Sequence, residues 1–106
     1  MKVIRVHKTV KKAFKDLNEP LRYRIAELFD LLAAGESLGM PVSRPMPEIA
    51  HGAHELRIKD ESGQYRVFYY TKIKDMIVVF HFFKKKSQTT PKKEMDTARQ
   101  RLKDLL

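Results

Sequence analysis

The sequence predicts an α+β fold, with a small twisted antiparallel sheet, an N-terminal αα-hairpin on one face and a C-terminal helix. Residues 54–59 alternate between apolar and charged side chains, and a polar turn at 60–63 separates them from a second run at 64–71. This alternation is typical of an antiparallel hairpin with one buried face. Residues 76–83 are almost wholly apolar, which favours a central strand covered on both faces. Helical spacing of apolar residues on either side completes the prediction.

The sequence pattern of the N-terminal third predicts one strand followed by two helices. Residues 2–7 should form the strand, with Ile4 and Val6 toward the core. Residues 8–17 and 20–34 should each form a helix, because apolar residues recur at spacings of three and four. The two helices together should form the αα-hairpin. Their apolar stripes are Val10, Phe14 and Leu17 in the first, and Leu21, Ile25, Leu28, Phe29 and Leu32 in the second.

The remaining segments predict a loop and a last helix. Residues 36–53 contain three prolines and two glycines, so they should form a loop rather than a strand, and its length marks it as mobile or functional. The last helix should begin with Thr90 as its N-cap and Pro91 at its first helical position. All these elements are expected to form one domain over residues 1–106.

Composition limits the classes of function. The formal net charge is +9, and residues 51–106 carry thirteen Lys or Arg against seven Asp or Glu, giving +6. Such a surface favours nucleic acid or an acidic protein, with simple solubility as the alternative. There is no cysteine, which excludes a disulfide framework and a thiolate metal site. We read no signal peptide and no run of about 20 apolar residues, so we expect a cytoplasmic protein that does not insert into a membrane.

Three segments together resemble RelE/HigB-type toxins, in particular the phage-derived branch of that superfamily. They are Glu-Leu-Arg-Ile-Lys at 55–59, Tyr-Arg-Val-Phe-Tyr at 65–69, and the lysine-to-proline run at 82–94. The resemblance covers nearly the whole chain. It implies a ribosome-dependent messenger-RNA endonuclease, an mRNA interferase of a type II toxin–antitoxin system, with no cofactor. The implied partners are the ribosome, messenger RNA and a cognate antitoxin of the helix-turn-helix type.

The resemblance also implies positions for the functional cations. Arg57 and Lys59 match two basic residues that alternate on the first hairpin strand of RelE-like members. Arg66 matches an arginine that follows a tyrosine on the second strand, and Lys84 or Lys85 matches a basic residue after the third. RelE also has a functional tyrosine near its C-terminus. No tyrosine follows the second strand here, so that role is unassigned.

The chemistry of these residues suits RNA cleavage without a metal. RNA cleaves itself when its 2′-hydroxyl is deprotonated and placed in line with the phosphorus, and fixed cations stabilise the charge that develops. The general base is left open among Glu55, Lys59 with a pKa lowered by neighbouring cations, and His81. The cations assigned to catalysis are Arg57, Lys59, Arg66, Lys84 and Lys85, and RNA contacts extend to Lys86 and Lys92.

Other interpretations of the same residues remain open. Glu55, Arg57 and Lys59 could be an ordinary solvated strand face with cross-strand charge pairs. Arg66 is expected to be exposed, so that its loss leaves the fold nearly intact, or else to stack on aromatic neighbours. His81 could be a core histidine. The rival functions are a non-catalytic RNA- or protein-binding module with a RelE-like fold, and a structural phage accessory protein.

Overall fold

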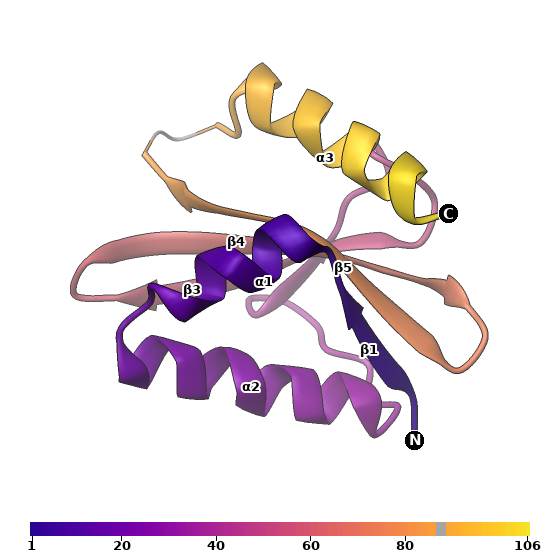
Figure 1. The fold of residues 1–106 in the computed structure, drawn as a ribbon, viewed down its shortest axis with the longest axis horizontal. Coiled ribbons are helices and arrows are strands. Elements are labelled where there is room, and N and C mark those ends of the chain that lie inside the picture. Colours follow the sequence, from indigo (N-terminus) through magenta and orange to yellow (C-terminus); the bar gives the residue numbers. More distant parts are fainter. Residues whose placement is uncertain (87–88) are drawn as a thin grey trace.

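A computed structural model describes residues 1–86 and 89–106 as a five-stranded sheet with helices on both faces (Figure 1). The spatial order of the strands is β1-β5-β4-β3-β2. The α+β class predicted from the sequence is therefore confirmed. Along the chain the elements are β1 (Val3–Val6), α1 (Lys8–Lys15), α2 (Glu19–Ala33), β2 (Ser43–Pro45), β3 (Ala53–Asp60), β4 (Gly63–Ile73), β5 (Met76–Lys85) and α3 (Lys92–Leu105).

The three long strands form the predicted antiparallel sheet. In the β3–β4 hairpin, Arg57 lies opposite Arg66. The turn is closed by Asp60, whose Oδ1 accepts a hydrogen bond of 2.8 Å from the backbone N–H of Ser62. Gly63 has a φ of 144°, a conformation that residues with a Cβ rarely adopt. β5 lies between β1 and β4, which confirms its central place and explains why its sequence is apolar on both faces.

Two features of the sheet differ from the prediction. β1 pairs with β5 in parallel, so the sheet is mixed rather than wholly antiparallel. Residues 43–45 form a short strand against β3, so the prediction of an unbroken loop over 36–53 was wrong there. The prolines mislead because β2 is an edge strand, where Pro45 can be tolerated. The buried Ser43 holds β2 in place through a 2.6 Å hydrogen bond between its Oγ and the Tyr69 hydroxyl.

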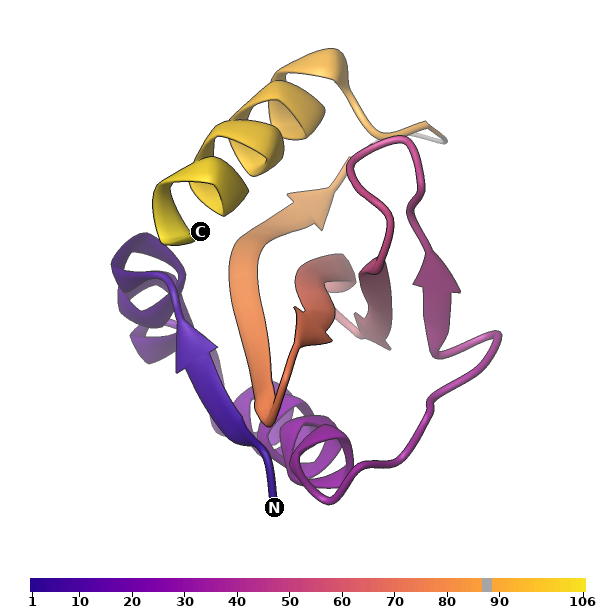
Figure 2. The ribbon, with the colours of Figure 1, turned by 90° about the vertical axis from the view of Figure 1, so that its right-hand side faces the viewer.

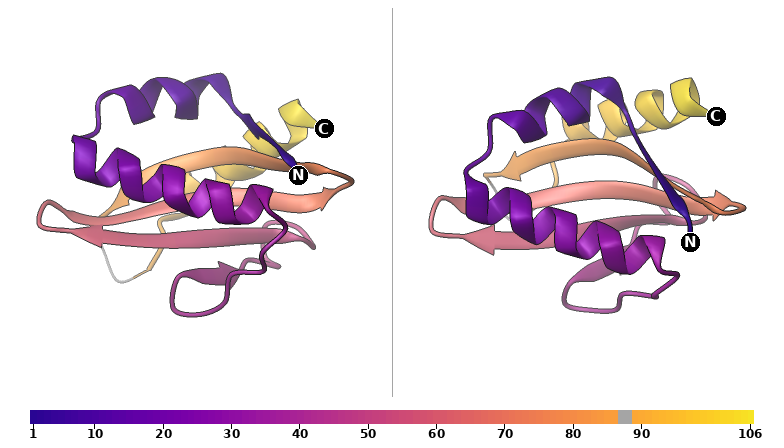
Figure 3. Two further views of the ribbon diagram at one scale, coloured as in Figure 1. Left: turned by 90° about the horizontal axis from the view of Figure 1, so that it is seen from below. Right: turned by 60° about the horizontal axis from the view of Figure 1, so that its bottom comes forward.

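The helices divide the core into two clusters, one on each face of the sheet. Apolar side chains of α1 and α2 join one cluster, which includes Val10 and Leu28 and packs on Leu56 and Val67. Ala98 and Leu102 of α3 join the other cluster. Figure 2 shows the strands between α2 and α3, and Figure 3 shows α1 and α2 in front of the sheet with α3 behind it. The two apolar stripes predicted for α1 and α2 therefore face the core, as does a stripe on α3 that consists of Met95, Ala98, Leu102 and Leu105.

α2 and α3 begin with different kinds of cap. Asn18 caps α2, because its side chain accepts a 2.9 Å hydrogen bond from the Leu21 N–H. Thr90 does not cap α3. The cap residue is Pro91, whose carbonyl accepts from the N–H groups of the first turn, so the helix begins one residue later than predicted. No helix within the described residues is long and apolar enough to cross a membrane.

Candidate active site

A pocket of about 420 Å³ opens on the α3 face of the sheet, where β3 and β5 meet the start of α3. Its lining combines three cations with one buried carboxylate. Arg57 comes from β3, Lys85 from the end of β5, and Arg44 from β2. The buried carboxylate is Glu55. Glu48 also lines the pocket, but it is exposed, with its Oε2 4.0 Å from Arg44 Nη1. The pocket therefore gathers positive charge from three strands at one place.

Beneath the pocket, Arg66 and Glu55 form a buried ion pair. Arg66 Nε lies 3.4 Å from Glu55 Oε1, and both side chains are about 95% buried. Arg57 Nε approaches the same oxygen at 3.6 Å. Glu55 thus holds two guanidinium groups side by side, one buried and one at the pocket wall.

The buried position of Arg66 contradicts the expectation that it is exposed. The residue is only 3% exposed, because it points inward on β4 toward the α3 face. Its Nη1 donates a 3.1 Å hydrogen bond to the Tyr65 carbonyl and its Nη2 a 3.3 Å bond to Gln64 Oε1. Its Nε makes no hydrogen bond within the described residues. Burial lowers the pKa of Arg66, yet an arginine side chain stays protonated. The buried positive charge of Arg66 is therefore compensated by the carboxylate of Glu55.

The structure separates the two lysines that the sequence left as alternatives. Adjacent residues of a strand point to opposite faces. Lys85, opposite Gln64, lines the pocket, whereas Lys84 lies opposite Tyr65 on the other face, its Nζ 5.9 Å from the Tyr65 ring centre. Burial lowers the pKa of Lys85, and the neighbouring charge of Arg66 lowers it further. Lys85 is therefore the lysine at the pocket that gives up its proton more readily than usual.

The other predicted cations lie outside the pocket. Lys59 is exposed near the hairpin turn, opposite Gln64 and on the strand face of Arg57. Lys86 is exposed after β5, and Lys92 donates a 2.7 Å hydrogen bond to Asp96 on α3. None of these three residues lines the pocket.

Arg44 is a pocket residue that sequence reasoning missed. It stands between Ser43 and Pro45 in a segment expected to be a loop, and it pairs with Glu55 in the β2–β3 register. That pairing joins residues far apart in the chain, so no local pattern points to it. The single local signal is a cation beside a proline, which is too common to be informative.

His81, one of the three candidate bases, is a buried histidine with both ring nitrogens occupied. Its Nε2 lies 2.7 Å from Glu94 Oε1, and its Nδ1 lies 2.8 Å from Arg101 Nη1. A guanidinium can only donate, so Nδ1 accepts and the Nε2–H donates to Glu94. Burial lowers the pKa of His81, which keeps the ring neutral. His81 therefore joins β5 to α3, and it does not line the pocket.

This arrangement predicts a loss of stability in mild acid. Because the folded state holds His81 with a lowered pKa, the unfolded state binds a proton first as the pH falls below about 6.5, and unfolding becomes easier. The pKa values of His7 and His54 are lowered too, again mainly by burial, and act in the same direction. Urea unfolding of wild type and His81→Gln at pH 7.5 and 5.5 measures the effect. We expect a smaller pH dependence in the variant, and equal dependence would contradict this role for His81.

The described residues show no arrangement suited to a metal ion. Within residues 1–86 and 89–106, no three His, Cys, Asp or Glu side chains lie close enough together to hold one. The pocket instead presents three cations, Arg44, Arg57 and Lys85, together with the carboxylates of Glu48 and Glu55. What this arrangement can do chemically is bind an anion and move a proton.

Comparison with known proteins identifies a solved structure with the same fold and a family to which the chain belongs. No curated protein matches the chain. Among solved structures, the chain is similar to an arginine-to-alanine double mutant of the E. coli toxin RelE in the free state, with a TM-score of 0.52 and 18% identity over 99% of this chain and 98% of that one. At this identity the likeness shows a shared fold. The family model described as phage derived protein Gp49-like (DUF891) matches residues 12–103. The chain therefore belongs to the Gp49-like family of phage-derived proteins and has a RelE-like fold, as the hairpin and the lysine run predict.

Proposed function

We propose that this protein is the toxin of a toxin–antitoxin pair and cleaves messenger RNA on the ribosome. The observation that carries the proposal is the meeting of Arg44, Arg57 and Lys85 at one pocket, with the buried Arg66 beneath it. The structure that shares the fold is that of a toxin, which supports the same function. The proposal includes a cytoplasmic location and a cognate antitoxin of the helix-turn-helix type.

The proposed reaction needs phosphate binding and proton transfer. Arg57 and Arg44 would hold the scissile phosphate, since guanidinium groups bind phosphate oxygens through two hydrogen bonds. The RNA 2′-hydroxyl gives its proton to a base, and its oxygen attacks the phosphorus. The bond to the 5′-oxygen breaks, and the leaving 5′-oxygen takes up a proton from water. The products are a 2′,3′-cyclic phosphate, which can open to a 3′-phosphate, and a 5′-hydroxyl. Positive charge that is fixed before the reaction stabilises the phosphorane-like transition state.

We assign proton removal from the 2′-hydroxyl to Lys85. Of the bases first considered, Glu55 is buried between two arginines, His81 has both nitrogens engaged, and Lys59 lies outside the pocket. Lys85 lines the pocket, and its pKa is lowered by burial and by Arg66. A base with a lowered pKa has more of its neutral form at working pH.

Induction in a bacterial host, followed by mapping of messenger-RNA 5′ ends, tests the function. We expect growth arrest and new 5′-hydroxyl ends that keep phase with codons, because cleavage would occur in the ribosomal decoding site. Co-expression of the adjacent reading frame should restore growth. RNA binding without new ends would instead favour the binding-module alternative.

Salt dependence offers an independent prediction for the cations. If about three of them contact phosphates, the logarithm of RNA affinity should fall with the logarithm of salt with a slope of about −2, through counterion release. Arg57→Ala should reduce that slope by about 0.7, since one phosphate contact is lost. Fluorescence anisotropy with a short single-stranded RNA measures both. A slope near zero in wild type would show that the charge is only a solvated surface.

A further inference from the structure

The pocket on the α3 face is larger and chemically more mixed than phosphate binding requires. Its volume of about 420 Å³ falls in the range of sites that hold a small organic ligand, about 300–1,000 Å³. Besides the cations and the buried Glu55, its lining includes three methionines and one exposed carboxylate, which are Met40, Met46, Met95 and Glu48. A phosphate gains nothing from a thioether, and a carboxylate repels it. These four residues therefore indicate a second group in the pocket beside the phosphate.

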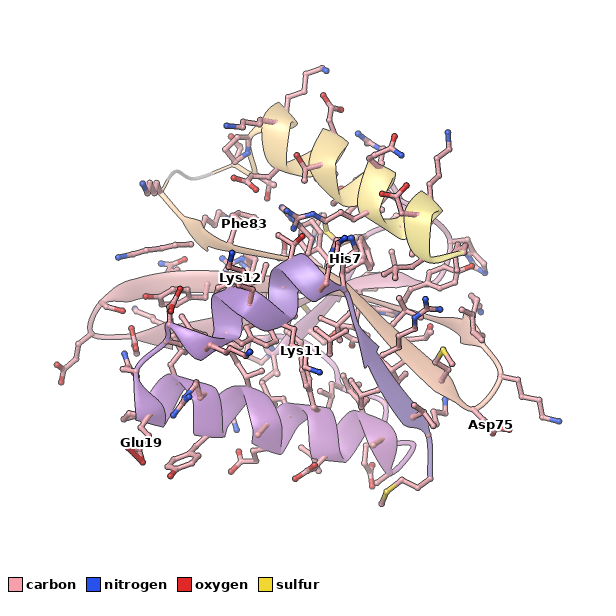
Figure 4. All side chains as sticks on the ribbon, in the orientation of Figure 1. His7, Lys11, Lys12, Glu19, Asp75 and Phe83 are labelled. Atoms are coloured by element: carbon pink, nitrogen blue, oxygen red, sulfur yellow. The ribbon has the colours of Figure 1, made fainter. Side chains whose placement is uncertain are left out.

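The methionines give the pocket an apolar wall. Three of the five methionines of the chain line this one pocket. Met40 lies before β2, Met46 directly after it, and Met95 in α3. Met46 is only 2% exposed and belongs to the core cluster on the α3 face, against which Met95 packs. Figure 4 shows Phe83 of the same cluster on β5, on the side of the sheet where α3 lies. Two of the three thioethers thus rest on packed core beside the cations.

A thioether wall suits a flat aromatic ring. Methionine sulfur makes favourable contacts with aromatic rings, and the unbranched side chain adapts its shape to them. Proteins that bind single-stranded RNA usually place aromatic side chains where the bases stack. Among the described residues that line the pocket none is aromatic, so methionine is the side chain available for this contact. The aromatic group nearest to a phosphate in an RNA strand is a base.

Glu48 supplies hydrogen-bond acceptors at the same wall. Its side chain is 44% exposed, and its Oε2 lies 4.0 Å from Arg44 Nη1, which is too far for a hydrogen bond. The same Nη1 donates a 3.0 Å hydrogen bond to Met46 Sδ, so Arg44 stands between the thioether and the carboxylate. Within the described residues the Glu48 carboxylate has no other ion-pair partner. Both of its oxygens are therefore available to donors of a bound ligand.

The backbone of Glu48 is fixed from two sides. Arg99 of α3 donates a 2.9 Å hydrogen bond from its Nη2 to the Glu48 carbonyl. In the same loop, the N–H of Ile49 donates a 3.0 Å hydrogen bond to the Met46 carbonyl. A carboxylate carried on an ordered backbone loses less conformational freedom when it binds a ligand. The loop between β2 and β3 thus presents Glu48 as a prepared acceptor.

Guanine is the base whose edge matches a carboxylate. On its Watson–Crick edge the N1–H and the 2-amino group are adjacent donors, which can pair with the two oxygens of one carboxylate. Adenine and cytosine each offer an amino group beside a ring nitrogen that accepts, and the one N–H of uracil lies between two carbonyl oxygens. An ionised carboxylate only accepts, so it is repelled by those neighbouring acceptors.

We propose that Glu48 binds the Watson–Crick edge of a guanine next to the scissile phosphate, with the ring against the methionine wall. We call this part of the pocket the base subsite; it consists of Met40, Met46, Glu48 and Met95. The proposal rests on the proposed function, because it names the nucleotide that the same pocket selects. Arg44 keeps its phosphate contact and separates the phosphate from the base.

Binding of short RNAs without the ribosome tests the base subsite. The probes are fluorescein-labelled uridine strands of five nucleotides, 2′-O-methylated so that they cannot be cleaved, with one central base varied. We expect guanine to bind about fivefold more tightly than inosine, which lacks the 2-amino group, and about tenfold more tightly than adenine or uracil. The value for inosine is at the low end for a bidentate pair because Glu48 is partly exposed. Fluorescence anisotropy with the full chain at constant salt measures all four affinities.

Glu48→Gln should have two effects of opposite sign. It removes a negative charge from a cationic pocket, so strands without guanine should bind about two- to threefold more tightly. It also removes the paired acceptors, so the ratio of guanine to inosine affinity should fall below about twofold. Glu61→Gln is the matched control, because Glu61 is an exposed carboxylate of the hairpin turn that does not line the pocket. It should keep the wild-type ratio, and circular dichroism checks that both variants are folded.

Three results would overturn the base subsite. The first is no binding, or equal binding of all four strands, by wild type. The second is a guanine preference that Glu48→Gln retains while all affinities rise together, which would make Glu48 only a partner of Arg44. The third is an equal loss of the preference in Glu61→Gln. The proposed function fails separately: guanine-selective binding by a protein that leaves messenger RNA uncut on the ribosome sinks cleavage and leaves the base subsite standing.

Discussion

Arg66→Ala is expected to lower the free energy of unfolding by about 3 kcal/mol and to abolish cleavage. Removing one partner of a buried ion pair leaves the other charge without compensation. Here Glu55 would keep only Arg57, whose Nε lies 3.6 Å away and whose side chain is one-third exposed. The hydrogen bonds to Tyr65 and Gln64 are lost as well. Urea unfolding and ribosome-dependent cleavage of the same purified variant measure both effects.

A double variant separates stability from activity. Replacing both members of a buried pair with hydrophobic side chains of similar volume is often neutral or stabilising. Glu55→Leu combined with Arg66→Met should therefore regain most of the lost stability while cleavage stays low, because Arg57 no longer has its carboxylate. Recovery of both properties would show that Arg66 and Glu55 only hold the sheet together. A stable and fully active Arg66→Ala protein would remove this ion pair from the site altogether.

Lys85→Ala is expected to reduce cleavage by about 10²–10⁴, the range in which general bases contribute, with little change in stability. Lys85 is half-buried and makes no ion pair within the described chain, so its loss leaves no buried charge behind. Lys85→Arg should be nearly as inactive, because arginine keeps the charge but does not release its proton. The logarithm of the wild-type rate should rise with pH until Lys85 is neutral and level off below its ordinary pKa of about 10.4.

Lys84→Ala is the matched comparison. Lys84 is the adjacent lysine, but it lies over the Tyr65 ring on the opposite face. We expect it to lose less than about tenfold in cleavage. An active Lys85→Arg, or an equal loss in the two alanine variants, would show that the lysine run acts through charge alone and not as a base.

The sequence predicted the elements that depend on local periodicity. Alternation over 54–59 and the apolar run over 76–83 correspond to β3 and β5, and the helical stripes correspond to α1, α2 and α3. These signals are local, because each side chain's direction follows from its place in a strand or helix. The same reasoning places Glu55 and Arg57 on one strand face, where the structure finds them.

The parts that were missed depend on contacts between distant segments. The burial of Arg66 depends on β5 and on what covers the α3 face, and Arg44 reaches the pocket only because β2 pairs with β3. Which of Lys84 and Lys85 faces the pocket depends on the β4–β5 register, which shifts at an irregularity between Phe68 and Tyr69. No single stretch of sequence contains these relationships.

The parallel pairing of β1 with β5 orders the events of folding. β1 precedes the other described strands in the chain, and its neighbour in the sheet is the last of them, with Val3 opposite Met76 and Val6 opposite Val79. Contacts between residues so far apart in sequence form slowly, because a long loop must close before they are made. β1 can therefore pair with β5 only after most of the described chain has been synthesised. Until β5 has been made, β4 has an open edge and β1 lacks its partner strand, and open strand edges favour wrong pairing.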